Sequence, residues 1–258
     1  MHLKQSVCIP MLKPAAIPLA EFVERVAEIG YPAVEIWSKE NDFEELVRLT
    51  RKSGLVIASM IGHDWSGGAL NDPLQHQLID KKLRESIDIA ADHGIPGLIC
   101  FSGNRYEGLC EQQGIMNTVI GLLKIAPYAE KKGVNLNLEI LNSKVDHKGY
   151  QCDHVTWGVE VVEKVNSPRV KLLFDIYHMQ IMDGDIIRTI GENIQWVGHF
   201  HTAGVPGRHE LDETQELYYP AIARAISATP YDLYVGHEFS PLGDLYKGLE
   251  QAYQSCDF

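Results

Sequence analysis

The sequence predicts a single (β/α)8 barrel that takes in residues 1–258, and three observations support this fold. Eight short apolar runs alternate with eight longer amphipathic stretches from one end of the chain to the other. The length of 258 residues is close to the roughly 250 residues of one such barrel. Four apolar runs in the second half end on an acidic residue or a histidine, at intervals of 36, 26 and 37 residues, near the roughly 30 residues of one βα unit.

The elements alternate in order along the chain. We expect strands at about 6–10, 33–37, 55–61, 97–101, 134–141, 170–175, 196–201 and 233–239. We expect helices at about 18–29, 41–53, 73–93, 115–132, 154–166, 184–193, 217–228 and 242–253. Pro18 suits the first turn of a helix, and glycines stand where four helices should end, at Gly30, Gly54, Gly94 and Gly133. A doubly wound open sheet is the competing fold, but residues 9–14 lack the glycine-rich phosphate loop that it needs.

The composition limits the classes of partner. A formal net charge of −12 argues against nucleic acid and against an anionic membrane surface, because phosphate backbones require a basic footprint. A small phosphorylated substrate needs one Arg or Lys and stays possible. Five cysteines without a CxxC spacing predict free thiols in a reducing compartment, so we expect a cytoplasmic protein. No stretch approaches the roughly 18 apolar residues of a membrane span, although a leader removed during maturation would leave no trace.

The four apolar runs of the second half end on residues that bind metals in proteins. They are 135–139 with Glu139, 170–175 with Asp175, 196–201 with His201, and 233–238 with Glu238. In a closed parallel sheet the carboxyl ends of the strands meet at one face, so these side chains should converge. A carboxylate buried without a partner costs several kcal/mol, and a shared divalent cation explains three of them beside a histidine. The four are therefore candidate ligands of one ion.

Glu139 and Asp175 each have an alternative interpretation. The period-two pattern places Asn137 and Glu139 on one strand face, directed into the barrel, whereas a strand-end glutamate could instead bend out to solvent. Asp175 could be a helix N-cap, because aspartate commonly caps helices. We prefer a ligand role, since Asp183 or Asp185 is a better cap and the residues after Asp175 do not open a polar helical turn.

The two histidines of the third run lie on one side of their strand. His199 and His201 are two residues apart, and a lone histidine in an apolar strand is usually a core residue. The register with the carboxylates favours His201 as the ligand, with His199 in a hydrogen-bonded layer beneath it. Gly236 leaves room inside the barrel two residues before Glu238, and His237 should face the helices. Carboxylates with one imidazole suit a single Mn²⁺, Mg²⁺, Co²⁺ or Zn²⁺ ion.

Such a site predicts proton transfer within an α-hydroxy carbonyl compound. A divalent ion would bind both oxygens and stabilise the enediolate that forms when the carbon-bound proton leaves. One glutamate would remove the proton, and the other would return it to the neighbouring carbon or to the opposite face. The first outcome is isomerisation and the second is epimerisation. Glu139 and Glu238 are the candidate acid and base, in either order.

Several motifs of the second half resemble the hydroxypyruvate isomerase family of the xylose-isomerase-like barrels, which also include ketose 3-epimerases. They are Glu139-Ile-Leu-Asn142, Phe174-Asp-Ile-Tyr-His178, Gly198-His-Phe-His201, Gly204-Val-Pro-Gly-Arg208 and Val235-Gly-His-Glu238. The resemblance implies a divalent metal held by Glu139, Asp175, His201 and Glu238, with the two glutamates also moving protons. It covers nearly the whole chain, but residues 1–110 match only in general pattern.

The chain departs from that family in three places. Hydroxypyruvate isomerases tend to have Gln where this chain has His201, whereas the epimerases have His. The loop 142–147 is shifted from the usual Asn-Arg-aromatic-acid pattern, and 59–72 is shorter than the isomerase counterpart. These departures bear on the substrate more than on the metal site. The resemblance as a whole implies an isomerase of the aldose-ketose type that acts on a sugar or a hydroxy-keto acid, with a ketose 3-epimerase as the alternative.

Candidate substrate-binding residues lie in the loops after the strands: His178, Arg208, Asn142, Trp65 and His63, together with Asp146 and Trp37. The resemblance implies that His178 and Arg208 contact substrate oxygens. His178 could instead bond to backbone, and Arg208 could make a surface salt bridge. Trp65, near His63 in the sequence, could cover a sugar ring or pack under a loop. The same two roles are open for Trp37.

Other functions share parts of this pattern. A metal-dependent sugar dehydratase starts with the same proton abstraction and then expels water, and a non-catalytic sugar-binding barrel would keep the pocket without turnover. A DNA-repair nuclease like endonuclease IV would need several zinc ions and a basic groove, which the charge of −12 disfavours. Because exposed helices can be buried between barrels, we expect a homodimer or a homotetramer.

Overall fold

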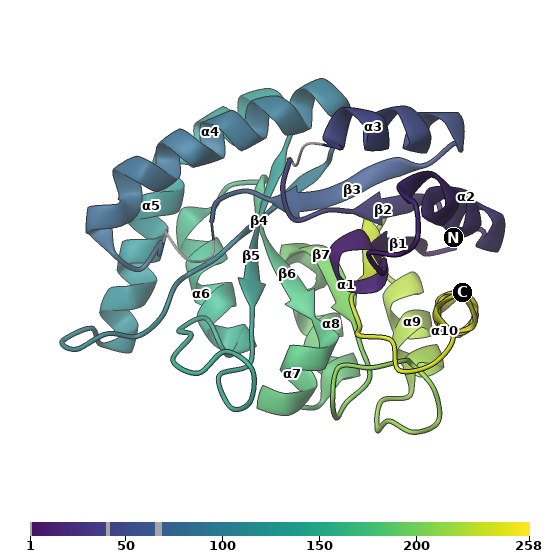
Figure 1. Ribbon diagram of the computed structural model, residues 1–258. Helices are drawn as coiled ribbons and strands as arrows, with labels where there is room; N and C mark the ends of the chain where they lie inside the picture. Colours follow the sequence, from purple (N-terminus) through teal and green to yellow (C-terminus); the bar gives the residue numbers. More distant parts are fainter. Residues whose placement is uncertain (1, 40–41, 65–68) are drawn as a thin grey trace.

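Eight parallel strands close into a barrel in the computed structural model, which describes residues 2–39, 42–64 and 69–258 (Figure 1). The strands are β1 (Lys4–Cys8), β2 (Ala33–Glu35), β3 (Val56–Ile61), β4 (Gly97–Cys100), β5 (Asn135–Ile140), β6 (Val170–Asp175), β7 (Val197–Thr202) and β8 (Tyr234–His237). Each strand pairs with the next along the chain, and β8 pairs back onto β1. This order confirms the predicted barrel and rules out the doubly wound open sheet.

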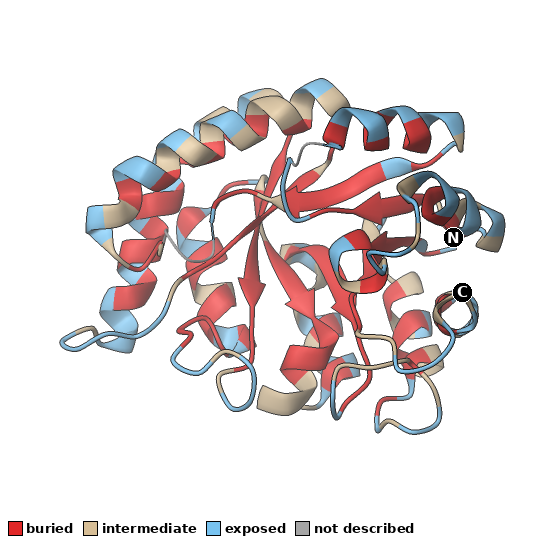
Figure 2. Cartoon of the chain, viewed as in Figure 1, coloured by how far each residue is buried: buried red, intermediate tan, exposed pale blue. Residues whose placement is uncertain are grey.

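The helices surround the barrel and leave their outer faces exposed. They are α1 (Ile9–Leu12), α2 (Leu19–Ile29), α3 (Phe43–Lys52), α4 (His76–His93), α5 (Glu111–Lys132), α6 (Val155–Val165), α7 (Ile176–Met182), α8 (Ile186–Asn193), α9 (Tyr219–Ser227) and α10 (Leu245–Cys256), with 3-10 turns at Pro73–Gln75 and Ile194–Trp196. The strands are almost wholly buried, whereas the helices alternate buried and exposed residues (Figure 2), as amphipathic periodicity predicts. None of the helices in the described ranges is long and apolar enough to cross a membrane.

Glycines determine which polar side chains fit inside the barrel. Asn137 of β5 is buried, and a Cβ at Gly97 of β4 or at Gly198 of β7 would overlap its amide. The expectation that the Asn137 face of β5 points inward is therefore met. On the other face of β5, Ile140 packs against α6, where Gly158 gives the strand a close approach.

Two of the differences between the predicted and the observed elements have a clear physical reason. β1 ends at Cys8 instead of residue 10, because Pro10 lies in the first turn of α1, where its missing N–H is not needed. An unpredicted helix, α7, follows β6 directly and has Asp175 as its N-cap. Its first four residues are all buried, so the segment lacks the polar first turn that would have identified a helix start.

Candidate active site

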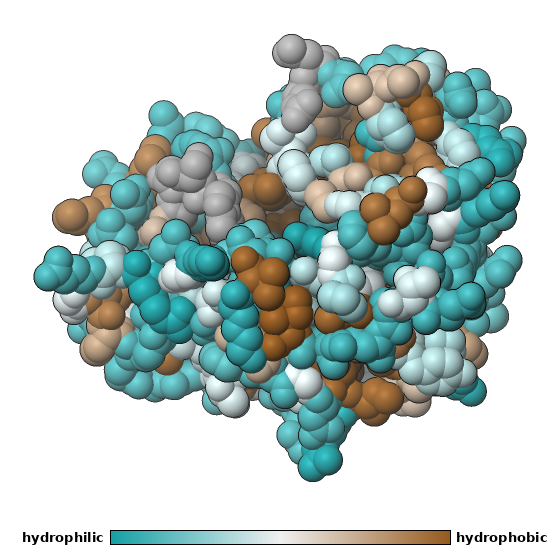
Figure 3. Space-filling view, turned by 60° about the horizontal axis from the view of Figure 1, so that its bottom comes forward, coloured by the Kyte–Doolittle hydropathy of each residue, from teal (hydrophilic) through white to brown (hydrophobic). Residues whose placement is uncertain are grey.

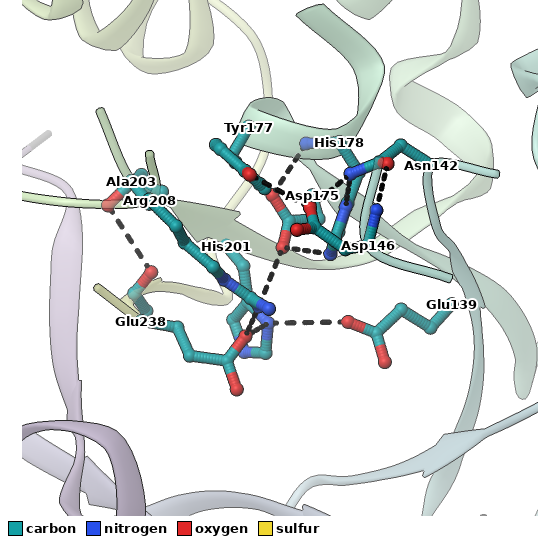
Figure 4. Close-up of polar contacts among 12 residues, drawn as sticks. Glu139, Asn142, Asp146, Asp175, Tyr177, His178, His201, Ala203, Arg208 and Glu238 are labelled. Carbon is teal, nitrogen blue, oxygen red and sulfur yellow. Dashed lines mark hydrogen bonds and ion pairs between the residues drawn. The ribbon is translucent and has the colours of Figure 1, made fainter. Parts of the chain in front are cut away.

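The four candidate ligands meet at the carboxyl-terminal end of the barrel. Glu139 lies near the end of β5, Asp175 ends β6, His201 lies in β7, and Glu238 directly follows β8. One ligand atom from each lies within 4.8 Å of the others, and all four residues are buried. Figure 4 shows their side chains directed toward a common centre. The predicted convergence is observed, and the role of the four as ligands stays a prediction.

His201 and Arg208 provide the positive side of this cluster. His201 Nδ1 lies 3.1 Å from Glu238 Oε2 and 3.7 Å from Glu139 Oε1, yet it has no well-aligned hydrogen-bond partner among the described residues. Arg208 reaches in from the loop after β7. Its Nη2 lies 2.6 Å from Glu238 Oε2 and 3.5 Å from Asp175 Oδ2 (Figure 4). The guanidinium therefore pairs with two of the three carboxylates.

Burial and neighbouring charge act in opposite directions on these groups. Burial raises the pKa of Asp175 to about 7, although Arg208 and His201 oppose the shift. Burial disfavours the anion of Glu238 too, but Arg208 and His201 outweigh it and lower the pKa of that carboxyl to about 2. Burial alone would lower the pKa of His201, but Glu238 and Glu35 outweigh it and raise that pKa well above its usual value. The cluster is thus a poorly hydrated acidic site that gains from positive charge.

The donor set of the cluster fits a divalent cation. It offers oxygens from Glu139, Asp175 and Glu238 and one imidazole nitrogen from His201, a combination that suits Mg²⁺, Mn²⁺, Co²⁺ or Zn²⁺. The buried Nδ1 of His201 has no aligned partner in the described chain and faces the carboxylates. The raised pKa of His201 favours a proton on this nitrogen, and a bound cation would take the place of that proton between the same carboxylates. These four residues could therefore hold a metal ion.

Asp175 also has the capping role that we expected at Asp183 or Asp185, which corrects the sequence interpretation. Its Oδ1 accepts a hydrogen bond from the His178 N–H at 3.2 Å and so caps α7. Asp185 precedes α8 in a left-handed conformation and makes no side-chain cap. The two carboxylate oxygens of Asp175 have different contacts: Oδ1 caps the helix, and Oδ2 faces Arg208 in the cluster.

His178 and Asn142 form a buried chain of contacts behind Asp175. His178 Nε2 lies 3.5 Å from Asp175 Oδ2, and its Nδ1 lies 2.6 Å from Asn142 Nδ2. Asn142 also donates to Asp146 Oδ2, which accepts a second hydrogen bond from Tyr177 (Figure 4). Asn142 and Asp146 therefore orient His178, and His178 is the member of this chain that adjoins the cluster. Substrate contact by Asn142 stays a prediction.

A cavity of about 350 Å³ adjoins the cluster. Its lining residues are Met11, Trp37, Ile61, Ile99, Phe101, Glu139, Leu141, His147, Arg208 and Glu238. Most of the apolar lining comes from the first half of the chain, whereas the charged lining comes from the second. Figure 3 brings this end of the barrel forward and shows hydrophobic residues among hydrophilic ones. The cavity thus has one apolar side and one charged side.

The remaining aromatic and histidine candidates have different positions. Trp37 lines the cavity and donates from Nε1 to Glu238 Oε1 at 3.4 Å. His63 is buried, accepts a hydrogen bond from the Phe101 N–H, and is not among the described lining residues. Trp65 lies outside the described residues. Among these candidates, the geometry favours a direct role for Trp37 and a structural one for His63.

Sequence reasoning missed two residues beside the cluster, Glu35 and Cys8. Glu35 ends β2 and contacts His199 and His201, so His199 does lie in the hydrogen-bonded layer that we expected beneath His201. The Cys8 thiol donates to Glu238 Oε1 at 3.6 Å. Glu35 could have been found from the same signal as Glu139, because it is a lone acidic residue within the apolar run 33–37.

Comparisons with known proteins agree with this fold. A family model described as "Xylose isomerase-like TIM barrel" matches residues 23–256. A Danio rerio protein named "Putative hydroxypyruvate isomerase" is 28% identical over 251 residues, covering 90% of this chain and 89% of that protein. A 2-oxo-tetronate isomerase of Pectobacterium atrosepticum is 26% identical over 249 residues, with 90% of each chain covered.

Solved structures give the same architecture. A crystal structure titled as an AP endonuclease, family 2, from Brucella melitensis superimposes with a TM-score of 0.85 at 26% identity, covering 96% of both chains. The 3-keto-D-glucoside 4-epimerase of E. coli gives a TM-score of 0.83 at 19% identity, covering 98% of this chain and 100% of that one, which shows the fold alone. With the family model matching most of its length and relatives named as isomerases, the protein belongs to the xylose isomerase-like TIM-barrel family and is an isomerase.

Proposed function

We propose that this isomerase transfers a proton between adjacent carbons of an α-hydroxy carbonyl compound, with a divalent metal ion held by Glu139, Asp175, His201 and Glu238. The supporting observation is that two glutamates from different strands flank His201 at one cavity (Figure 4). A carboxylate on each side of a bound substrate can accept a proton and return one. When bound, the ion would supply Lewis-acid stabilisation of the charge that develops on the substrate oxygens.

The residues of the chain divide the reaction between them. One of Glu139 and Glu238 removes the carbon-bound proton, which leaves an enediolate, and the other returns a proton to the neighbouring carbon. The hydroxyl proton passes to the former carbonyl oxygen, so that the carbonyl and hydroxyl groups exchange places. Arg208 holds positive charge beside Glu238 and Asp175 at the cavity wall and would bind a substrate oxygen or carboxylate. His178, fixed by Asn142, would donate a hydrogen bond to a substrate oxygen from its Nε2.

The names of the relatives suggest the class of substrate. Hydroxypyruvate and 2-oxo-tetronate are short acids with an oxo group beside a hydroxylated carbon. We propose a short hydroxy-keto acid or a small sugar, because the 350 Å³ cavity offers its charged contacts at one end. A cytoplasmic location and a homodimeric or homotetrameric assembly belong to the same proposal.

A ketose 3-epimerase is the second candidate, and the presence of His201 favours it. The epimerases of the resembling family carry His at this position, whereas the hydroxypyruvate isomerases tend to carry Gln. Both reactions begin with the same proton abstraction. In isomerisation the proton returns to the neighbouring carbon, whereas in epimerisation it returns to the opposite face of the same carbon. The pair formed by Glu139 and Glu238 serves either outcome.

Solvent exchange in D₂O tests the proposal. Purified protein, stripped with EDTA and reloaded with Mn²⁺, Mg²⁺, Co²⁺ or Zn²⁺, would be incubated with hydroxypyruvate, 2-oxo-tetronate and a panel of ketoses. We expect metal-dependent deuterium incorporation at the carbon next to the carbonyl, which would be measured by the loss of its ¹H NMR signal. Product identity then separates isomerisation from epimerisation. Full exchange by the stripped protein would refute metal dependence.

The same measurements address the other functions. A product lighter by one water would identify a dehydratase, and binding without exchange would identify a sugar-binding barrel. The Brucella melitensis structure carries a nuclease title, so cleavage of abasic DNA would be assayed in parallel. We expect none, because the cavity combines acidic and apolar residues and the chain carries a net charge of −12.

A further inference from the structure

A buried carboxylate that the proposed reaction does not use lies one layer beneath His201. Glu35 is 2% exposed. Its Oε1 lies 3.0 Å from His199 Nε2, and its Oε2 lies 3.0 Å from His201 Nε2. Ser6 Oγ donates a further hydrogen bond to Oε1. Each oxygen of Glu35 therefore binds one imidazole.

The barrel is built to let Glu35 reach these two rings. Glu35 belongs to β2 and the histidines to β7, so the side chain spans the interior past β1 and β8. Ser6 is its contact on β1. On β8 it passes Gly236, where a Cβ would overlap Glu35 Oε1 and would also crowd His201 Cδ2. A glycine at this position thus opens the path that the carboxylate occupies.

The two hydrogen bonds fix the chemistry of His201. An ionised carboxylate only accepts, so each imidazole must donate from its Nε2. With the Nε2 proton committed to Glu35, Nδ1 is the ring nitrogen that faces Glu139 and Glu238. A second hydrogen bond of this kind is how proteins orient ligating histidines.

We propose that Glu35 is a positioning residue that holds the His201 ring and its Nε2–H tautomer so that Nδ1 serves as a metal ligand. The inference rests on the proposed metal-dependent function. Glu35, His199 and His201 also satisfy the spacing of a metal-binding group. Hydrogen bonds already account for both carboxylate oxygens, so we assign this group to support of His201 instead of a second ion.

Glu35→Gln tests the assignment, because an amide has one oxygen and one NH₂ group and cannot accept from both rings. Mn²⁺ binding to the EDTA-stripped full-length protein would be measured by isothermal titration calorimetry. We expect the Mn²⁺ dissociation constant to rise about 10- to 100-fold, the usual effect of removing such a partner. Activity should recover as Mn²⁺ is raised. Glu35→Asp, which keeps the charge but is too short to span both rings, should weaken Mn²⁺ binding as well.

A matched control separates positioning from general destabilisation. Asp153→Asn removes another buried carboxylate, one that pairs with Arg105, and should lower the free energy of unfolding while leaving Mn²⁺ affinity unchanged. Equal loss of Mn²⁺ affinity in Asp153→Asn and Glu35→Gln would overturn the inference. So would unchanged affinity in both Glu35 variants, or two ions per wild-type chain with one lost in Glu35→Gln. Absence of Mn²⁺ binding by the wild-type protein would instead refute the proposed function.

Discussion

The two halves of the barrel contribute different kinds of side chain to one cavity. Strands β5 to β8 and the loops after them supply Glu139, Asp175, His201, Arg208 and Glu238. The first half lines the same cavity mainly with apolar or aromatic side chains, namely Met11, Trp37, Ile61, Ile99 and Phe101. The second half thus supplies the charged groups of the cavity, and the first half supplies most of its apolar wall.

Burial at this end of the barrel determines how strongly the charges of the cluster interact. Burial raises the pKa of Asp175 to about 7, which shows that this end of the barrel hydrates charge poorly. In such surroundings, charge interactions are stronger than in water. Glu35 is the exception in the first half, because its carboxylate is directed beneath His201 and away from the cavity. The first half therefore supports the charged site through both its apolar wall and Glu35.

The largest expected effect is on the charged half. Glu139→Gln keeps the size of the side chain but removes a proton acceptor and a charged ligand. We expect solvent exchange to fall by about 10²–10⁴-fold or more, the usual contribution of general acid–base catalysis. Glu160→Gln, on the exposed side of α6 beside Lys164, is the matched control and should change nothing. Retained exchange with an intact fold, judged by circular dichroism, would remove Glu139 from catalysis.

A smaller effect is expected at Arg208, where the charged half meets the cavity. Arg208→Ala removes charge-assisted hydrogen bonding of about 1.5–3 kcal/mol to an anionic partner, so KM should rise about 10- to 100-fold. Mn²⁺ affinity should suffer less, because the guanidinium pairs with two of the candidate ligands and competes for them. Arg208→Lys should recover part of the loss, since it keeps the charge without the planar fork. An unchanged KM would contradict a substrate-binding role.

The sequence predicted the charged half better than the apolar half. The spacing of Glu139, Asp175, His201 and Glu238 matched one βα unit, so the barrel and their convergence could be inferred together. Each of these strands ends on an acidic residue or a histidine after an otherwise apolar run. This local pattern can be read from one sequence alone. The metal itself and the roles of the glutamates leave no comparable signal, and they stay predictions.

The parts that were not predicted depend on contacts across the barrel. Glu35 has the same local pattern as Glu139, but its partners His199 and His201 lie 164 and 166 residues away in the sequence. Nothing near Glu35 indicates that Gly236 clears its path. Helix α7 was missed because tertiary burial of its first turn replaces the polar pattern of a surface helix. Asp175 consequently combines a cap and a candidate ligand role, which we had treated as alternatives.

The smallest effect on activity is expected at His63, a polar residue of the first half. Its hydrogen bond is to a backbone N–H, so this residue should affect stability instead of activity. Its Nε2 accepts from the Phe101 N–H, so protonation would break that bond. Burial lowers the pKa of His63 from 6.5 to about 4, which means that the folded protein prefers the neutral ring. The resulting stability is present above pH 6.5 and is lost as the pH falls toward 4, with a limit of about 3 kcal/mol.

His63→Gln keeps an acceptor for Phe101 and has no proton to gain in this range. The difference in unfolding free energy between wild type and variant, measured in urea at several pH values, should therefore shift in favour of the variant below pH 6.5. KM and solvent exchange at neutral pH should be unchanged. A raised KM without loss of stability would place His63 at the substrate after all, and the apolar half would then contribute a polar contact to the chemistry.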